Sequence, residues 1–170
     1  YSGLEELGNG EIQILEESFD SVAGIFHIFE EASFVMRDEQ INQMTDELRE
    51  DIYLLNDFKD SYIAEHNFIA NSQELLAGMS TDEVTEFLGT RAFQAEENEN
   101  KTRQVQAMLE DHLDRVIDLV HSHLDPRRAG NALGLAEDVK ERFVLITRQA
   151  VAKRDKINET VERFANLDLA

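Results

Sequence analysis

Apolar residues recur every three or four positions from Ile12 to Met36, and they form two stripes. The first stripe consists of Ile12, Leu15, Phe19, Val22, Phe26, Phe29, Ser33 and Met36. The second consists of Ile14, Ser21, Ile25, Ile28, Ala32 and Val35. The second stripe starts two residues after the first, and two residues turn an α-helix by roughly 200°. We therefore expect the stripes to face opposite ways, so that this helix either lies inside a large core or packs its own bundle on one side and another molecule on the other.

Three further segments show the same helical period, and turn residues separate them. They span about residues 38–77, 81–124 and 135–168, and with residues 11–36 they make four long helices. Asp38 can cap the second helix, Ser80 and Glu83 form a capping box before the third, and Asp125 with Pro126 closes the third. Short turns between long helices favour an all-α, up-down-up-down antiparallel four-helix bundle, folded as one domain over residues 1–170.

Three stretches depart from this pattern. Residues 1–10 indicate a short amphipathic lead-in, because the trio Gly8-Asn9-Gly10 is a poor helix former. Residues 94–104 contain Ala95 as their single apolar residue, so either the core thins there or the helix bends away from its neighbours. Residues 127–134 hold two glycines and are expected to be a loop or a first helical turn.

The charge of the chain limits its partners. Acidic residues outnumber lysine and arginine 36 to 16, which gives a formal net charge of −20. Such a field repels phosphate backbones, and no basic stripe with interleaved aromatic residues is present, so nucleic acid is not an expected partner. Cysteine is absent, which excludes disulfides, thiolate metal sites and cysteine nucleophiles. No apolar run reaches the length of a membrane span.

Motifs for catalysis or cofactor binding are missing from the sequence, so we expect no enzymatic activity and no cofactor. A carboxylate-bridged di-iron bundle needs Glu-x-x-His on two helices, and no histidine here has a glutamate three positions before it. A metal-binding bundle therefore ranks last among the alternatives. His66, His112 and His123 fall on apolar helix faces, which favours core or boundary residues with hydrogen-bond partners.

The cationic side chains are unevenly distributed. The first helix holds no lysine or arginine before Arg37. The end of the bundle that carries both the first and the third turn gathers the candidate ligand-binding residues: Arg37, Arg115, His121, His123, Arg127 and Arg128. In an acidic chain, such a patch attracts a small anionic ligand. The alternative is that these cations balance helix C-terminal dipoles and nearby carboxylates.

The layout resembles the extracytoplasmic four-helix-bundle sensor domain of bacterial chemoreceptors and related sensor kinases. Gly3-Leu4-Glu5-Glu6-Leu7 looks like the sequence that leaves a first transmembrane helix. The tail with Arg154-Asp155-Lys156-Ile157, Val161, Phe164 and Leu167-Asp168-Leu169 is similar to a segment that enters a second one. The resemblance covers the whole chain and rests on layout. It implies a periplasmic domain of an inner-membrane protein, with transmembrane helices flanking the chain.

Two functional hypotheses follow. In the first, the chain is the ligand-sensing domain of a chemoreceptor, which binds a small carboxylate near the membrane-distal end and transmits a shift of its last helix across the membrane. The resemblance also implies a homodimer, with the second stripe of Ile14, Ser21, Ile25, Ile28, Ala32 and Val35 as its interface. In the second hypothesis, the chain is a soluble helical interaction module whose exposed first helix binds a helix of another protein.

Overall fold

The fold is entirely helical over the part of the chain that the computed structural model describes, which is residues 2–169, with side chains for 10–65, 76–163 and 166. Within these residues lie five helices: α1 (Ser2–Met36), α2 (Glu39–Ala77), α3 (Thr81–Ser122), α4 (Pro126–Ala129) and α5 (Ala132–Leu169). The predicted all-α class is confirmed. The expected lead-in over residues 1–10 is wrong, because α1 runs without a break from Ser2.

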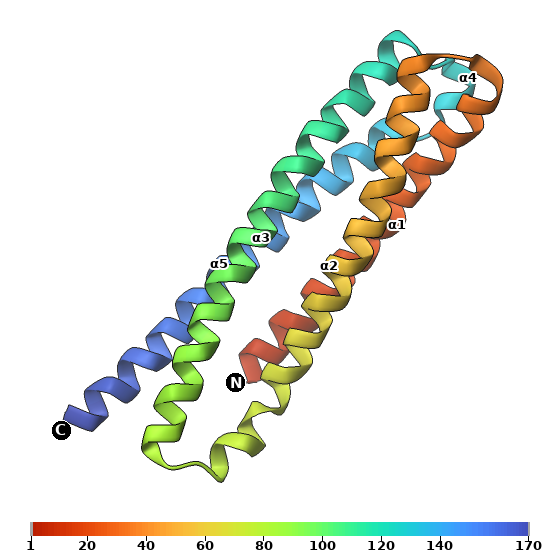
Figure 1. Cartoon of the computed structure of the whole chain (residues 1–170). Coiled ribbons are helices and arrows are strands. Elements are labelled where there is room, and N and C mark those ends of the chain that lie inside the picture. Colours follow the sequence, from red (N-terminus) through yellow and green to blue (C-terminus); the bar gives the residue numbers. More distant parts are fainter. Residues whose placement is uncertain (1, 170) are drawn as a thin grey trace.

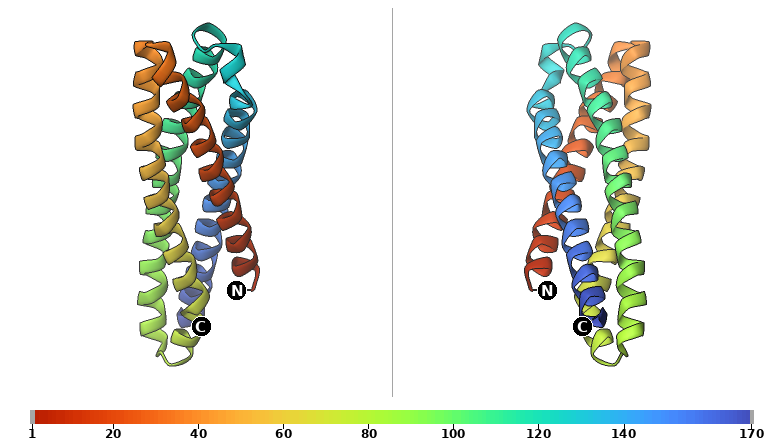
Figure 2. Two further views of the ribbon diagram at one scale, coloured as in Figure 1. Left: turned by 90° about the vertical axis from the view of Figure 1, so that its right-hand side faces the viewer. Right: turned by 90° about the vertical axis from the view of Figure 1, so that its left-hand side faces the viewer.

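The long helices lie side by side along a common direction (Figures 1 and 2). α1 packs against both α2 and α5, and α3 packs against α5 along much of its length but touches α2 far less. The short helix α4 lies at the end of the molecule where α1 passes into α2, and α1 begins and α5 ends at the other end (Figure 2). The two ends of the described chain therefore lie toward the same end of the molecule, away from α4.

Side chains cap the beginnings of α2 and α3 as the sequence predicts. Asp38 Oδ1 accepts hydrogen bonds from the backbone N–H of Gln40 at 2.9 Å and of Ile41 at 3.2 Å, which caps α2. Ser80 Oγ accepts from Glu83 N at 3.3 Å and donates to Glu83 Oε1 at 3.2 Å, which confirms a capping interaction between these two residues before α3. Residues 127–134, expected to be a loop or a first turn, instead supply most of α4 and the start of α5.

One buried stripe, with steps of alternately four and three residues, runs along α1. Its members are Glu11, Leu15, Ser18, Val22, Ile25, Phe29 and Ala32. This stripe takes residues from both predicted stripes, so the expectation that those stripes face opposite ways is wrong. Val22 and Ile25 belong to different predicted stripes, yet residues three apart are separated by only roughly 60° around a helix. The two stripes are adjoining parts of one broad face, which α1 needs because it packs against two helices.

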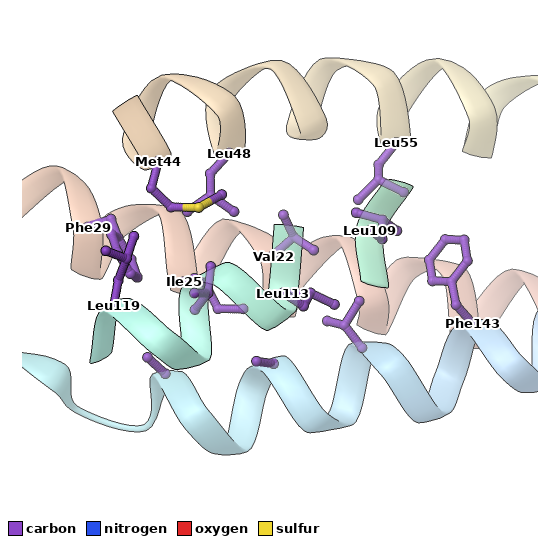
Figure 3. Close-up of a cluster of buried hydrophobic side chains, with 14 of the residues drawn as sticks. Val22, Ile25, Phe29, Met44, Leu48, Leu55, Leu109, Leu113, Leu119 and Phe143 are labelled. Carbon is purple, nitrogen blue, oxygen red and sulfur yellow. The ribbon is translucent and has the colours of Figure 1, made fainter. Parts of the chain in front are cut away.

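The other long helices bury stripes of the same kind. In α2 the stripe is Ile41, Met44, Leu48, Asp51, Leu55, Phe58 and Tyr62, and in α5 it is Ala132, Ala136, Val139, Phe143, Ile146, Ala150, Lys153 and Ile157. Apolar side chains from α1, α2, α3 and α5 converge into one core (Figure 3). α1 and α5 approach closely at Gly24, where a Cβ atom would lie 3.1 Å from Leu135 Cδ1.

Candidate functional site

The predicted ligand-binding residues gather at the end of the molecule that carries α4, but they do not form one site. Arg37 is exposed and has a left-handed backbone, with φ of 47°, where α1 passes into α2. His121 is exposed in the last turn of α3, and Arg127 and Arg128 are exposed in α4. Arg128 Nε lies 3.9 Å from Asp125 Oδ2. These exposed cations are spread over three different helices and turns.

His123 has a structural partner. Its Nδ1 lies 2.7 Å from Oδ2 of Asp38, while Oδ1 of the same carboxylate caps α2. The hydrogen bond with His123, together with the backbone hydrogen bonds, lowers the pKa of the Asp38 carboxyl below its ordinary range. Asp38 therefore ties the last turn of α3 to the first turn of α2. The interpretation of His123 and His112 as boundary residues with hydrogen-bond partners is confirmed, whereas the side chain of His66 lies outside the described residues.

We expect ionised Asp38 to increase the free energy of unfolding, and we expect this contribution to be lost at acid pH. Because its pKa is lowered on folding, the contribution is full above the pKa of the unfolded chain and is lost as the pH falls through the folded pKa. Asp38→Asn keeps a good N-cap but cannot ionise. The difference in free energy of unfolding between wild type and Asp38→Asn should therefore shrink between about pH 5 and pH 2.

Urea unfolding of the two proteins across this range measures that difference. All other carboxylates titrate in both proteins, so their contributions cancel in the comparison. A difference that stays constant or grows as the pH falls would contradict the role assigned to Asp38.

Arg115 lines a pocket between α2 and α3. The pocket measures about 350 Å³, lies between the first turns of α2 and the last turns of α3, and is lined by Gln40, Gln43, Met44, Arg115, Asp118, Leu119 and Ser122. Arg115 Nη2 lies 2.6 Å from Glu47 Oε2, and its Nε lies 3.7 Å from Asp111 Oδ2. Because a guanidinium carries five N–H donors, these two contacts leave donors for a further acceptor.

The predicted dimer interface on α1 is mostly internal. Ser21, Ile25 and Ala32 are buried inside the single chain, so the prediction that they contact a second copy is wrong for these three. Ile14 and Ile28 are partly buried and pack against the core. Val35 is 56 % exposed and remains a predicted contact. Ile25 and Ala32 lie in the α1 stripe that α2 and α5 cover, and Ser21 Oγ accepts a hydrogen bond from Arg142 Nη1 of α5 at 2.9 Å.

A buried ion pair that sequence reasoning missed joins three helices. Lys153 Nζ of α5 lies 2.5 Å from Oε2 of Glu11 in α1, whose side chain has no exposed surface. The same ammonium group donates a hydrogen bond to Tyr62 Oη of α2 at 3.1 Å. Burial, followed by the charge of Glu11, raises the pKa of the Tyr62 hydroxyl, so Tyr62 stays protonated. The cluster of Glu11, Tyr62 and Lys153 is called the central ion cluster below.

Further buried charges lie on α3 and α2. Glu99, with a side chain 4 % exposed, pairs with Arg154 of α5 and with Arg103 Nη2 at 3.1 Å. His112 Nδ1 lies 2.5 Å from Asp51 Oδ2, and burial raises the pKa of the Asp51 carboxyl while the hydrogen bond with His112 opposes that rise. Glu99 falls in residues 94–104, where few apolar side chains occur. The charged side chain of Glu99 therefore occupies a core position in the stretch where the sequence predicts either a thinner core or a helix that bends away from its neighbours.

A signal for these residues was present in the sequence. Glu11, Asp51 and Lys153 each occupy a position of a stripe whose other members are mostly apolar. Counting in alternating steps of three and four therefore identifies polar residues at core positions. It does not identify their partners, which lie on other helices.

The described residues contain neither a candidate membrane span nor a candidate metal centre. No helix among them is both long and apolar enough to cross a membrane. No group of three or more histidine, aspartate or glutamate side chains among them is placed to hold a metal ion. Comparison of the chain with protein-family models, with curated proteins and with solved structures finds no match.

Proposed function

We propose that this chain is a ligand-sensing domain that binds a small carboxylate-bearing molecule in the Arg115 pocket, defined by the residues lining the 350 Å³ cavity. Its fold, in this proposal, is an antiparallel up-down-up-down four-helix bundle in which α4 is a short link between the third and fourth long helices. By resemblance, it is the extracytoplasmic domain of a chemoreceptor or sensor kinase. It then acts in the periplasm as a homodimer, without enzymatic activity or a cofactor, and transmembrane helices flank it.

The observation that carries the proposal is the position of the Arg115 pocket relative to the chain ends. The pocket lies beside the first turns of α2 and the last turns of α3, at the end that carries α4. α1 begins and α5 ends at the opposite end (Figure 2). A ligand that favours one packing of the helices at the α4 end changes the relative position of α1 and α5 at the other end, and this is how a sensor transmits binding.

The chemistry of the Arg115 pocket defines the ligand class. Arg115 supplies a cation that matches the planar geometry of a carboxylate. Asp118 lines the same pocket and favours a ligand that also carries a hydroxyl or amine donor. Met44 and Leu119 give it an apolar floor. The volume of about 350 Å³ lies at the lower end of the range for small-molecule sites.

A binding screen tests this proposal. Small mono- and dicarboxylates and α-amino acids are tested for stabilisation of the folded protein, which should reach about 2.7 kcal/mol when a ligand is present at 100 times its Kd. For the ligand found, Arg115→Ala should weaken binding by roughly 10- to 100-fold, because a charge-assisted hydrogen bond contributes about 1.5–3 kcal/mol.

Arg49→Ala is the matched control. Arg49 is similarly exposed and paired with two carboxylates, Glu30 and Asp46, but it does not line the pocket. Its removal should leave the affinity unchanged. Equal affinity of wild type and Arg115→Ala would exclude the Arg115 pocket as the site.

Transmission is tested separately from binding. The chain has no cysteine, so paired spin labels can be attached through Gln13→Cys on α1 and Glu159→Cys on α5, both of which are exposed. The ligand should change the distance between the labels by about 1–2 Å, the size of helix shifts in known switches. A ligand that binds without changing this distance would identify a binding protein that does not signal through α1 and α5.

The homodimer requires an interface other than the buried α1 stripe. Phe34 is 81 % exposed and stands next to the exposed Val35 at the end of α1. Both apolar side chains lie near α4, the end at which ligand is proposed to bind. A contact between two copies through Phe34 and Val35 is therefore the form of the dimer that fits the burial pattern.

A further inference from the structure

Two cavities open on the outside of the molecule between α2 and α3. A cavity of about 610 Å³ opens between these helices and is lined by apolar side chains that include Tyr53, Leu54, Phe58, Val105 and Met108. A second cavity of about 390 Å³ lies farther along the same two helices, between Ser61 to Glu65 and Arg91 to Asn98. We call these two cavities together the α2–α3 groove. It is distinct from the Arg115 pocket, which lies nearer α4.

The groove follows from the way the helices pack. α1 packs closely on α2 and α3 packs closely on α5, whereas α2 and α3 make far fewer contacts with each other. Apolar side chains at the edge of the seam are left in water, because Tyr53 is 68 % exposed and Leu54 is 40 % exposed. Neighbouring exposed apolar residues beside a cavity are typical of an interaction surface.

The spacing of the lining residues matches a helical occupant. On α2, the lining positions run from Glu50 through Tyr53, Leu54 and Asp57 to the second cavity at Glu65, which is about 22 Å along a helix. On α3 the lining positions also repeat every three or four residues. The larger cavity has this periodicity and accepts the apolar face of a third helix. A helix of about four turns extends from there to the second cavity, whose lining is mostly polar.

The charged side chains that line the groove favour a cationic helix as its occupant. The acidic side chains Glu50, Asp57, Glu65 and Glu97 line the groove, against the cations Lys101 and Arg91. A second copy of this chain, with its own net charge of −20, would meet these carboxylates in the groove, so the acidic groove is a less favourable contact between copies than the apolar Phe34 and Val35. A helix with lysine or arginine beside its apolar face would meet these carboxylates with the opposite charge.

We propose that the α2–α3 groove binds a cationic amphipathic helix of another protein, with its apolar face on Tyr53, Leu54 and Met108 and its basic residues beside Glu50 and Asp57. This inference does not depend on the proposed ligand site. A protein that fails to bind carboxylates in the Arg115 pocket can still bind a helix in the groove.

The probe is a synthetic peptide of about four to five helical turns, with leucine along one face and lysine beside it. A scrambled peptide of the same composition has the same charge but no apolar face. Binding is measured by fluorescence anisotropy near physiological salt. The amphipathic peptide should bind wild type at least about tenfold more tightly than the scrambled peptide, because the groove contributes an apolar term beyond charge attraction.

Two variants with the same change of charge locate the site. Leu54→Lys puts a cation into the groove, and Leu145→Lys puts one on α5 at a residue of nearly equal exposure, 43 % against 40 %. We expect Leu54→Lys to weaken the binding of the amphipathic peptide about tenfold. Leu145→Lys should change the affinity for this peptide less than about twofold. Equal weakening by both variants, or equal binding of both peptides to wild type, would overturn the proposal, because the attraction would then be charge alone.

Methyl NMR locates the bound peptide independently of the variants. The chain has four methionines, of which Met108 lines the larger cavity, while Met36 ends α1 and Met79 lies between α2 and α3 in sequence. Peptide binding should shift the Met108 methyl resonance and leave those of Met36 and Met79 in place. Shifts at Met36 or Met79 with none at Met108 would overturn the proposal. So would self-association of wild type in light scattering that Leu54→Lys abolishes, since the occupant would then be a second copy.

Discussion

Lys153→Met is expected to lower the free energy of unfolding by about 3–5 kcal/mol, because it leaves Glu11 as a buried charge without a partner. The Glu11 side chain has no exposed surface and that of Lys153 is 11 % exposed, so water cannot replace the lost ammonium group. Tyr62 offers Glu11 only a neutral hydroxyl. Urea unfolding followed by circular dichroism at pH 7 measures the loss.

Two further variants show whether the loss comes from the unpaired charge. Lys140→Met removes another lysine of α5, whose Nζ lies 2.7 Å from Asp114 Oδ1 in a more exposed pair, and it should cost no more than about 1 kcal/mol. The double variant Glu11→Leu with Lys153→Met removes both charges of the buried pair. Its stability should return close to that of wild type or exceed it. A double variant as unstable as Lys153→Met alone would mean that packing of the lysine stem, and not its charge, accounts for the loss.

Phe29→Ala is expected to lower the free energy of unfolding by about 3–5 kcal/mol, because it opens a cavity in the core. Phe29 has no exposed surface and belongs to the α1 stripe that faces α2 and α5 (Figure 3). At protein concentrations low enough to keep the chain monomeric, the same substitution at Phe34, on the same helix but 81 % exposed, should change stability by no more than about 0.5 kcal/mol. Denaturant unfolding of both variants at one pH gives the comparison directly.

The pair Phe29 and Phe34 tests the burial pattern of α1 itself. Both residues are phenylalanines in the same apolar segment. The sequence pattern distinguishes them only because Phe29 falls on a predicted stripe and Phe34 does not. A large loss at Phe34 would mean that its side chain is covered in solution, as it would be in a stable dimer through Phe34 and Val35. Repeating the Phe34→Ala measurement at several protein concentrations distinguishes that case, because the stability of a dimer depends on concentration.

The secondary structure was largely predictable from the sequence. Apolar periodicity and capping residues such as Asp38 and Ser80 placed the four long helices, because these signals are local. The functional residues were less predictable. The sequence singled out Arg115 by charge and position, but it gave equal weight to Arg127 and Arg128, which are exposed on α4 and do not line the Arg115 pocket.

The central ion cluster shows why buried charged contacts between helices could not be predicted from the sequence. Lys153 and Tyr62 are 91 residues apart, and neither segment carries a motif that names the other as a partner. Counting in alternating steps of three and four places Lys153 at a core position. A lysine at such a position is compatible with a helix face exposed to water as well as with a buried ion pair. Only the arrangement of α1, α2 and α5 around one point distinguishes these two cases.

Periodicity along the chain, together with composition, was sufficient for the all-helical class, the approximate bounds of α2 and α3 and the acidic net charge, because each of these depends on composition or on residues close in sequence. The tertiary arrangement decided three other properties: that α1 has one broad buried face, that charges occupy the core near Glu99 and Lys153, and that a groove lies between α2 and α3. The physical reason is that a period defines the angle of a residue around its own helix. Burial depends instead on which neighbouring helices cover that angle.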